Sequence, residues 1–145
     1  MPLESMTLPS VAARPSRALH LSVWLVQLLL AAAFLLVGHT HAIAPIDVAV
    51  ARAPWVASLP VALVRFIGVA ELAGALGLLL PAATRILPML TPLAAAGLAM
   101  MMALAIPFHL VRGETSAILI NVVLGSLAAF VAWTRTRRAR IPARS

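Results

Sequence analysis

The segment from Pro60 to Pro81, PVALVRFIGVAELAGALGLLLP, decides the fold of this chain. It has the length of a membrane-spanning helix, which needs about 20 apolar residues to cross the hydrocarbon core. Two charged residues interrupt it, Arg65 and Glu71. A charged side chain at the centre of such a helix costs about 2.5–3.5 kcal/mol on insertion scales. The segment therefore predicts a spanning helix whose carboxyl group faces the interior of a helix bundle.

The face of this helix that carries Glu71 is lined by small residues, namely Gly68, Gly74 and Ala75. Small residues let membrane helices approach closely and gain packing energy. Two interpretations of Glu71 remain open. It is either a hydrogen-bonding contact that holds a tight bundle together, together with Asn121, or the acid of a small cavity that opens toward one leaflet.

Three further apolar runs resemble this one in length. The chain has 145 residues, of which 63% are hydrophobic and 10% charged, and a mean hydropathy of +1.05. A soluble domain is about half apolar and about a quarter charged. The composition thus excludes most soluble classes and predicts an all-α integral membrane four-helix bundle. The expected parts are a polar N-terminal tail (1–17), a transmembrane domain (18–134) with helices at 19–38, 60–80, 86–108 and 115–133, a short interfacial helix within 48–56, and a basic C-terminal tail (135–145).

The distribution of arginine predicts an orientation. All eleven basic residues are arginines, and the net charge is +7. In a soluble protein this charge would suggest nucleic acid, but here the arginines flank apolar runs, so no nucleic acid is expected. Positive residues concentrate on the cytoplasmic side of membrane proteins. We therefore expect a bacterial inner-membrane protein with both termini cytoplasmic, and a tail cluster, Arg135–Arg140, that lies against anionic headgroups as an anchor. The arginines assigned to the inner side are Arg14, Arg17, Arg85, Arg135, Arg137, Arg138, Arg140 and Arg144, against Arg52 and Arg112 outside.

With this topology, nearly every polar side chain at membrane depth falls in the outer half. Glu71 lies about 15 Å into its helix and Asn121 about 9 Å into the last one, at 1.5 Å per residue. We expect Glu71 and His109 to be the catalytic candidates, with His109 or Asn121 as the partner of Glu71, because Arg65 is six residues away on another face. The other candidate ligand-binding residues are Arg65, Asn121, His41, Arg112 and Glu114.

The histidines raise the question of a metal. His39 and His41 are two residues apart, and His109 could lie near them. Three imidazoles can bind a metal ion. A His-x-His pair at a membrane surface is nevertheless more typical of a solvated helix end, and His20 lies at the opposite end from the others. We therefore predict neither a metal site nor a haem.

The order of these motifs resembles the DoxX-like family. The similarity rests on Val64–Pro81, on Leu90–Leu98 followed by Met101–Ala105, on His109–Glu114, and on Asn121, and it extends over about Leu28 to Arg135. It implies a four-helix bacterial inner-membrane protein. Some relatives are subunits of a thiosulfate:quinone oxidoreductase, and others are associated with membrane-bound oxidative-stress or thiol-redox complexes. The family's glycine followed three residues later by lysine corresponds to Gly38 and His41, so a titratable group replaces a fixed cation.

Three functional hypotheses follow. The first is a quinone-linked or redox-complex membrane subunit, with quinone as the cofactor and a membrane or soluble redox protein as the partner. The alternative is a non-catalytic scaffold or docking subunit that uses the basic tail. The third is a small-solute or lipid-handling protein. The lipid bilayer is the one partner common to all three. The sequence leaves open whether the chain is itself an enzyme and whether it forms a homo-oligomer.

Overall fold

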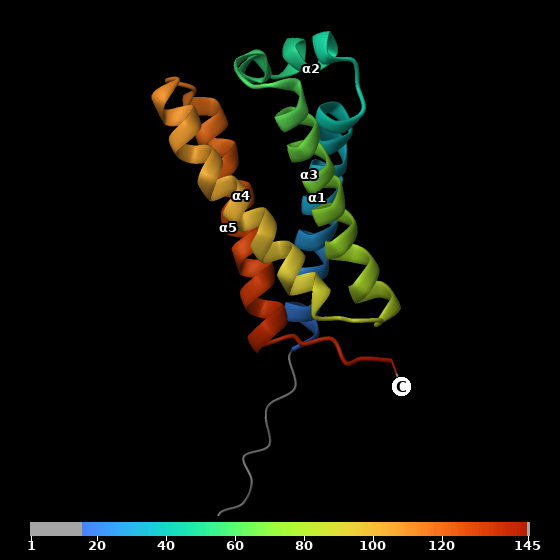
Figure 1. Ribbon diagram of the computed structural model, residues 1–145. Helices are drawn as coiled ribbons and strands as arrows, with labels where there is room; N and C mark the ends of the chain where they lie inside the picture. Colours follow the sequence, from blue (N-terminus) through green and yellow to red (C-terminus); the bar gives the residue numbers. More distant parts are fainter. Residues whose placement is uncertain (1–15, 145) are drawn as a thin grey trace, which may run out of the picture.

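The computed structural model describes residues 16–144 and is all-helical over that range, which confirms the predicted fold class. Four of its helices are long and apolar enough to cross a membrane. Figure 1 shows them as two pairs, α1 with α3 and α4 with α5, with the short α2 at one end. The elements are α1 (Arg17–Ala42), α2 (Ile46–Arg52), a 3₁₀ turn η1 (Pro54–Ser58), α3 (Val61–Thr84), α4 (Leu90–Val111) and α5 (Thr115–Arg137).

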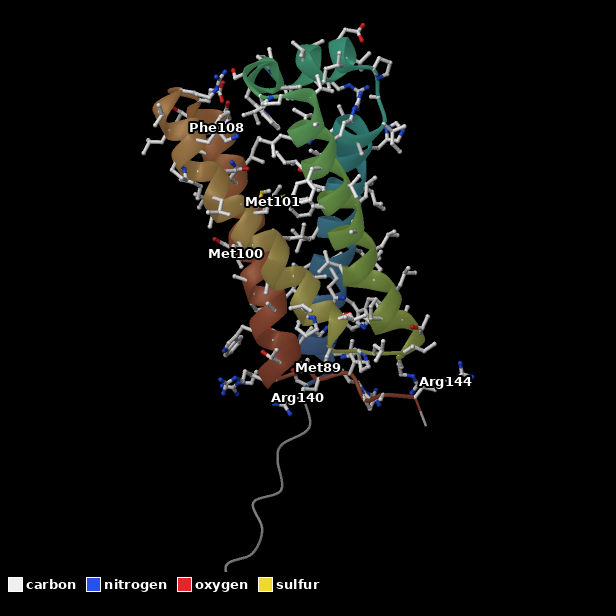
Figure 2. All side chains as sticks on the ribbon, in the orientation of Figure 1. Met89, Met100, Met101, Phe108, Arg140 and Arg144 are labelled. Carbon is white, nitrogen blue, oxygen red and sulfur yellow. The ribbon has the colours of Figure 1, made fainter. Side chains whose placement is uncertain are left out.

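The two ends of the bundle differ in the elements that they carry. The end that carries α2, η1 and the α4–α5 loop is called the α2 end, and the opposite end, where the described chain starts and finishes, is called the terminal end. The two helix pairs lie close together toward the terminal end and diverge toward the α2 end (Figure 1). Arg140 and Arg144 lie at the terminal end, and Phe108 lies near the other (Figure 2).

The helix bounds differ from the expected ones in ways that local chemistry explains. α1 continues to Ala42, which places His41 inside its last turn. α3 continues through Pro81, whose carbonyl oxygen accepts the Arg85 N–H at 3.0 Å. The helix ends when Arg85 takes a left-handed conformation, with φ of 60°.

α4 begins at Leu90 and not at residue 86, because a turn occupies the residues between α3 and α4. Leu87 has a φ of 48°, and Pro88 follows it. Proline disfavours the right-handed helical conformation for the residue before it. The expected interfacial helix is divided at Ala53 into α2 and η1, since Pro54 starts a new turn.

Two glycines of α3 mark close approaches to neighbouring helices. A Cβ at Gly68 would lie 2.3 Å from the Ala42 nitrogen, so the backbones of α3 and α1 touch there. A Cβ at Gly74 would lie 2.6 Å from the Leu98 side chain on α4. The main apolar core lies between the four long helices, and its large members include Leu30, Phe34, Leu78, Leu98 and Val131. All four long helices also expose large hydrophobic side chains on their outer surfaces, as expected for surfaces that face lipid.

The tail that was expected to begin at Arg135 begins later. α5 extends to Arg137, and Arg135 is only 2% exposed. Its Nε donates to Gln27 Oε1 at 2.6 Å, and Gln27 Nε2 donates to the Leu78 carbonyl oxygen at 2.6 Å. A buried polar contact thus links α5, α1 and α3 at the terminal end, where the sequence had indicated an almost entirely apolar interior.

Gly68→Ala is expected to destabilise the protein by about 1–3 kcal/mol, because α1 must move to make room for the methyl group. Gly97→Ala is the matched control, since a Cβ there meets nothing within 4 Å. Replacing glycine by alanine in an unobstructed helix is stabilising by about 0.5–1 kcal/mol. Thermal unfolding in mild detergent, followed by circular dichroism, measures both. Equal effects of the two substitutions would contradict the close α1–α3 contact.

Candidate functional site

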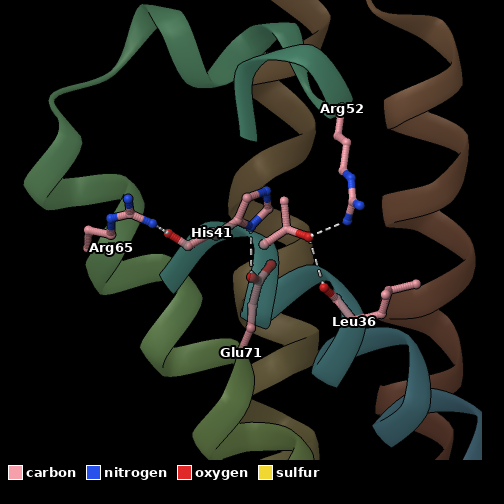
Figure 3. A network of polar contacts seen from close by, with 6 residues as sticks. Leu36, His41, Arg52, Arg65 and Glu71 are labelled. Carbon is pink, nitrogen blue, oxygen red and sulfur yellow. Dashed lines mark hydrogen bonds and ion pairs between the residues drawn. The ribbon is translucent and has the colours of Figure 1, made fainter. Parts of the chain in front are cut away.

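The candidate site is centred on a buried acid–imidazole pair. His41 Nδ1 lies 2.8 Å from Glu71 Oε2, and the side chains are only 6% and 5% exposed. Figure 3 shows the two groups facing each other from α1 and α3. The helices can meet here because Gly38 and Gly68 lie at the contact, and a Cβ at Gly38 would be 3.0 Å from the Glu71 Cβ. The small residues therefore set the distance at which the pair forms.

The contact with Glu71 determines which nitrogen of the His41 imidazole carries the proton. With Glu71 ionised, Nδ1 carries the proton and donates to the carboxylate, which leaves Nε2 as an acceptor. Within residues 16–144, the His41 side chain makes its hydrogen bond through Nδ1, and Nε2 makes none. A carboxylate that holds an imidazole in one tautomer while the other nitrogen stays free is the arrangement of a general base. The pair can accept a proton at Nε2 and share the charge with Glu71.

Arginines support the pair through the last turn of α1 and not through the carboxylate. Arg65 donates from Nη1 to the His41 carbonyl oxygen at 2.9 Å (Figure 3). Arg52 donates to Thr40 Oγ1 at 3.1 Å, and that hydroxyl in turn donates to the Leu36 carbonyl oxygen. Both arginines thereby bind the last turn of α1, whose carbonyl groups carry the negative end of the helix dipole. They hold His41 in position.

Trp55 of η1 joins the two helix pairs at the α2 end. Its ring lies 5.0 Å from the His41 ring in an edge-to-face arrangement. It also lies 6.2 Å from the Phe108 ring and 5.9 Å from the His109 ring, both on α4. Edge-to-face contacts at these distances are favourable between aromatic rings. One indole thus touches two histidines that belong to different helix pairs.

The second histidine has its own carboxylate. His109 Nδ1 lies 2.6 Å from Glu114 Oε2, and the other oxygen of Glu114 accepts from Arg112 Nε at 2.8 Å. Arg112 Nη1 donates to Ser58 Oγ at 2.5 Å, and the guanidinium lies 5.5 Å from the Phe108 ring. The α4–α5 loop is therefore tied to η1. The hydrogen bond from His109 is the main cause that lowers the pKa of Glu114, and Arg112 lowers it further.

The structure brings together some predicted residues and separates others. The partner of Glu71 is His41, and neither His109 nor Asn121 takes that position as expected. Asn121 is 8% exposed on α5, and its Nδ2 is buried with no partner among residues 16–144. His39 is exposed and does not join His41. In the same range, no group of three His, Asp or Glu side chains could hold a metal ion.

Three residues of the site were missed as site residues: Thr40, Arg52 and Trp55. Trp55 falls within the expected interfacial helix (48–56), where tryptophan usually anchors a protein at the membrane surface. The sequence does carry a signal for the position of Trp55. Pro45 and Pro54 lie on either side of α2, and they turn the chain back over the helix ends.

The lowered pKa of Glu114 gives a prediction about acid. Its ordinary value is 4.5. A carboxyl group whose pKa is lowered on folding stabilises the protein above its ordinary pKa and loses this contribution as the pH falls through the lowered value. We expect the glutamate ¹³C carboxyl signal that disappears in Glu114→Gln to titrate with a midpoint below 4.5. His109→Phe and Arg112→Gln should each raise that midpoint, because each removes a group that lowers the pKa of Glu114. A midpoint at or above the ordinary value in the unsubstituted protein would contradict the ion pair.

Comparison with known proteins adds a family to this geometry. The model of the DoxX-like family matches residues 25–131. That range holds His41, Glu71, Trp55, His109 and Asn121. No curated protein and no solved structure in the comparison matches the chain. Since the match covers well over half of the chain and the four apolar helices lie within or across it, the chain belongs to the DoxX-like family of membrane proteins.

Proposed function

We propose that the protein is the membrane subunit of a quinone-linked redox complex, with its quinone site at the α2 end. The buried His41–Glu71 pair is the observation that carries this proposal. Placing ionisable groups at membrane depth is costly, and such groups usually mark a proton or substrate pathway. A hydroquinone gives up two protons and two electrons on oxidation. Proton transfer is the part of that reaction for which these side chains are suited.

The roles of the residues follow from their free atoms. His41 Nε2 accepts the proton of a hydroquinone hydroxyl, and Glu71 stabilises the imidazolium through Nδ1. The unpartnered Nδ2 of Asn121 is a donor for a carbonyl oxygen of the ring. His109, with Nδ1 bound to Glu114, presents a second imidazole on the far side of Trp55. The electrons pass to or from a partner protein, which the redox complex would supply.

The aromatic residues favour a planar ligand. Trp55 and Phe108 lie at the same end as the two histidines and are partly buried. Aromatic rings bind other flat π-systems through stacked or edge-to-face contacts. A quinone head group would thus meet both apolar rings and polar atoms at the α2 end, and its hydrocarbon tail would remain in the lipid.

The charges of the two ends support the proposed orientation in a bacterial inner membrane. Three acidic residues are described, and all lie at or toward the α2 end: Asp47, Glu71 and Glu114. Seven arginines lie at the terminal end: Arg17, Arg85, Arg135, Arg137, Arg138, Arg140 and Arg144. The rule that positive residues stay inside places the terminal end in the cytoplasm. The quinone site would then lie in the outer half of the bilayer.

Single-cysteine variants test the orientation, because the chain has no cysteine of its own. We expect a membrane-impermeant maleimide to label Asp47→Cys, on exposed α2, in intact spheroplasts. It should label Ala143→Cys, in the exposed terminal segment, only after the membrane is permeabilised. The reverse pattern would show that the α2 end is cytoplasmic.

Bound quinone tests the function. The protein is purified in mild detergent, extracted with solvent, and assayed for quinone by chromatography. Glu71→Gln keeps the shape and an acceptor for His41 Nδ1 but loses the acid. We expect Glu71→Gln to retain no more than about one tenth of the quinone held by the unsubstituted protein. A tenfold reduction corresponds to the loss of one charge-assisted hydrogen bond. Asp47→Asn removes an exposed carboxylate at the same end and should behave like the unsubstituted protein. Absence of quinone from the unsubstituted protein, or equal retention in Glu71→Gln, would refute the site.

A further inference from the structure

A second polar centre lies at the terminal end, around the guanidinium of Arg135. The residue is 2% exposed on the last turn of α5. Nε donates to Gln27 Oε1 at 2.6 Å and Nη1 to the Ala139 carbonyl oxygen at 3.2 Å. The guanidinium carbon lies 5.3 Å from the Trp24 ring, while Nη2 is buried and has no hydrogen-bond partner. Every contact of this cation is therefore with a neutral group.

The charge of Arg135 is not compensated by the described chain. Arginine stays protonated at any pH at which proteins are folded. Buried charges in proteins are normally paired, because an isolated ion loses its hydration without recovering an equivalent interaction. The described acidic residues, Asp47, Glu71 and Glu114, all lie at or toward the α2 end. Over residues 16–144 the terminal end contains arginines and no carboxylate, so the counter-ion has to come from outside this part of the chain.

We infer that Arg135 is the centre of a binding site for a phosphate group. The guanidinium fork matches phosphate oxygens through two parallel hydrogen bonds, and Nη2 offers an unused donor for one of them. A phosphate group carries enough negative charge to neutralise the guanidinium. The acceptors now bound to Arg135, Gln27 Oε1 and the Ala139 carbonyl oxygen, are neutral and cannot do so.

The depth of Arg135 favours the phosphate of an anionic phospholipid as the source. Arg135 lies two residues before the end of a spanning helix, which is the level at which lipid headgroups meet a protein. Trp133, with its ring 5.7 Å from the Arg138 guanidinium, is exposed at the same level. The surrounding arginines that are exposed would attract anionic lipid toward the site: Arg17, Arg85, Arg137, Arg138, Arg140 and Arg144.

The segment that follows α5 covers the guanidinium and can give access to it. Ala139 accepts the hydrogen bond from Arg135 Nη1 and is itself fully buried. Beyond Ala139, one backbone hydrogen bond ties the described segment to the rest of the bundle, from Arg144 N to the Arg85 carbonyl oxygen at 3.0 Å. Figure 1 shows this segment crossing the terminal end. Displacing this segment would break the hydrogen bond from Arg135 Nη1 to Ala139 and uncover that side of the guanidinium.

Lipid binding to the purified full-length protein tests the inference. The probes are phosphatidylglycerol, zwitterionic phosphatidylcholine and inorganic phosphate, each added to protein that was delipidated in mild detergent. Binding is followed by native mass spectrometry and by the shift of the thermal unfolding midpoint. We expect phosphatidylglycerol to bind and to raise the midpoint, and phosphatidylcholine to do so less. A response to inorganic phosphate alone would support the same site with free phosphate as its source. No response to either anion would overturn the inference.

Variants separate the buried arginine from the surface charge. Arg135→Gln should weaken phosphatidylglycerol binding by about tenfold, and Arg138→Gln, which removes an exposed arginine nearby, by no more than about twofold. Equal weakening by both would assign binding to the basic surface and overturn the inference. Arg135→Lys keeps the charge but loses the fork, and it should weaken binding by an intermediate factor, which provides the test should Arg135→Gln not fold. Binding by Arg135→Lys equal to that of the unsubstituted protein would refute the role of the guanidinium fork.

Discussion

The contact between α1 and α3 at Gly38 and Gly68 is the constraint on which the α2 end depends. A Cβ at Gly68 would overlap the backbone of Ala42, so these helices touch without side chains between them. Only at this separation do His41 and Glu71 meet at 2.8 Å inside the bundle. The hydrogen bond offsets part of the cost of placing a carboxyl group at membrane depth. Close packing and the chemistry of the site thus have a common cause.

The bundle holds polar groups at both of its ends, but it does so in different ways. At the α2 end, Glu71 and Glu114 are each paired with a histidine, and Trp55 links the two helix pairs. At the terminal end, a buried arginine meets an amide, a carbonyl oxygen and an indole. One end has the groups for moving protons, and the other has an excess of positive charge. The proposed quinone site and the inferred phosphate site are independent of each other for this reason.

Much of the architecture was predictable because membrane insertion acts on local sequence. The thickness of the bilayer sets the lengths of the four apolar runs, and water accounts for the polarity of the loops. The small residues around Glu71 indicate close helix packing in the membrane. The exact helix ends were less predictable. α3 passes through Pro81 and α4 starts at Leu90, because the turn between them depends on the left-handed conformations of Arg85 and Leu87.

The sequence by itself determined the fold class, the number of spanning helices and the family, since these depend on the composition of each segment and on the order of the segments along the chain. Only the tertiary structure decided which polar groups meet. Glu71 selects His41 and not His109 or Asn121, Trp55 lies between two histidines, and Arg135 turns inward to Gln27. The physical reason is that these pairings depend on the crossing of helices and on how the chain folds back over their ends. Those relations join residues far apart in the chain, and no local pattern encodes them.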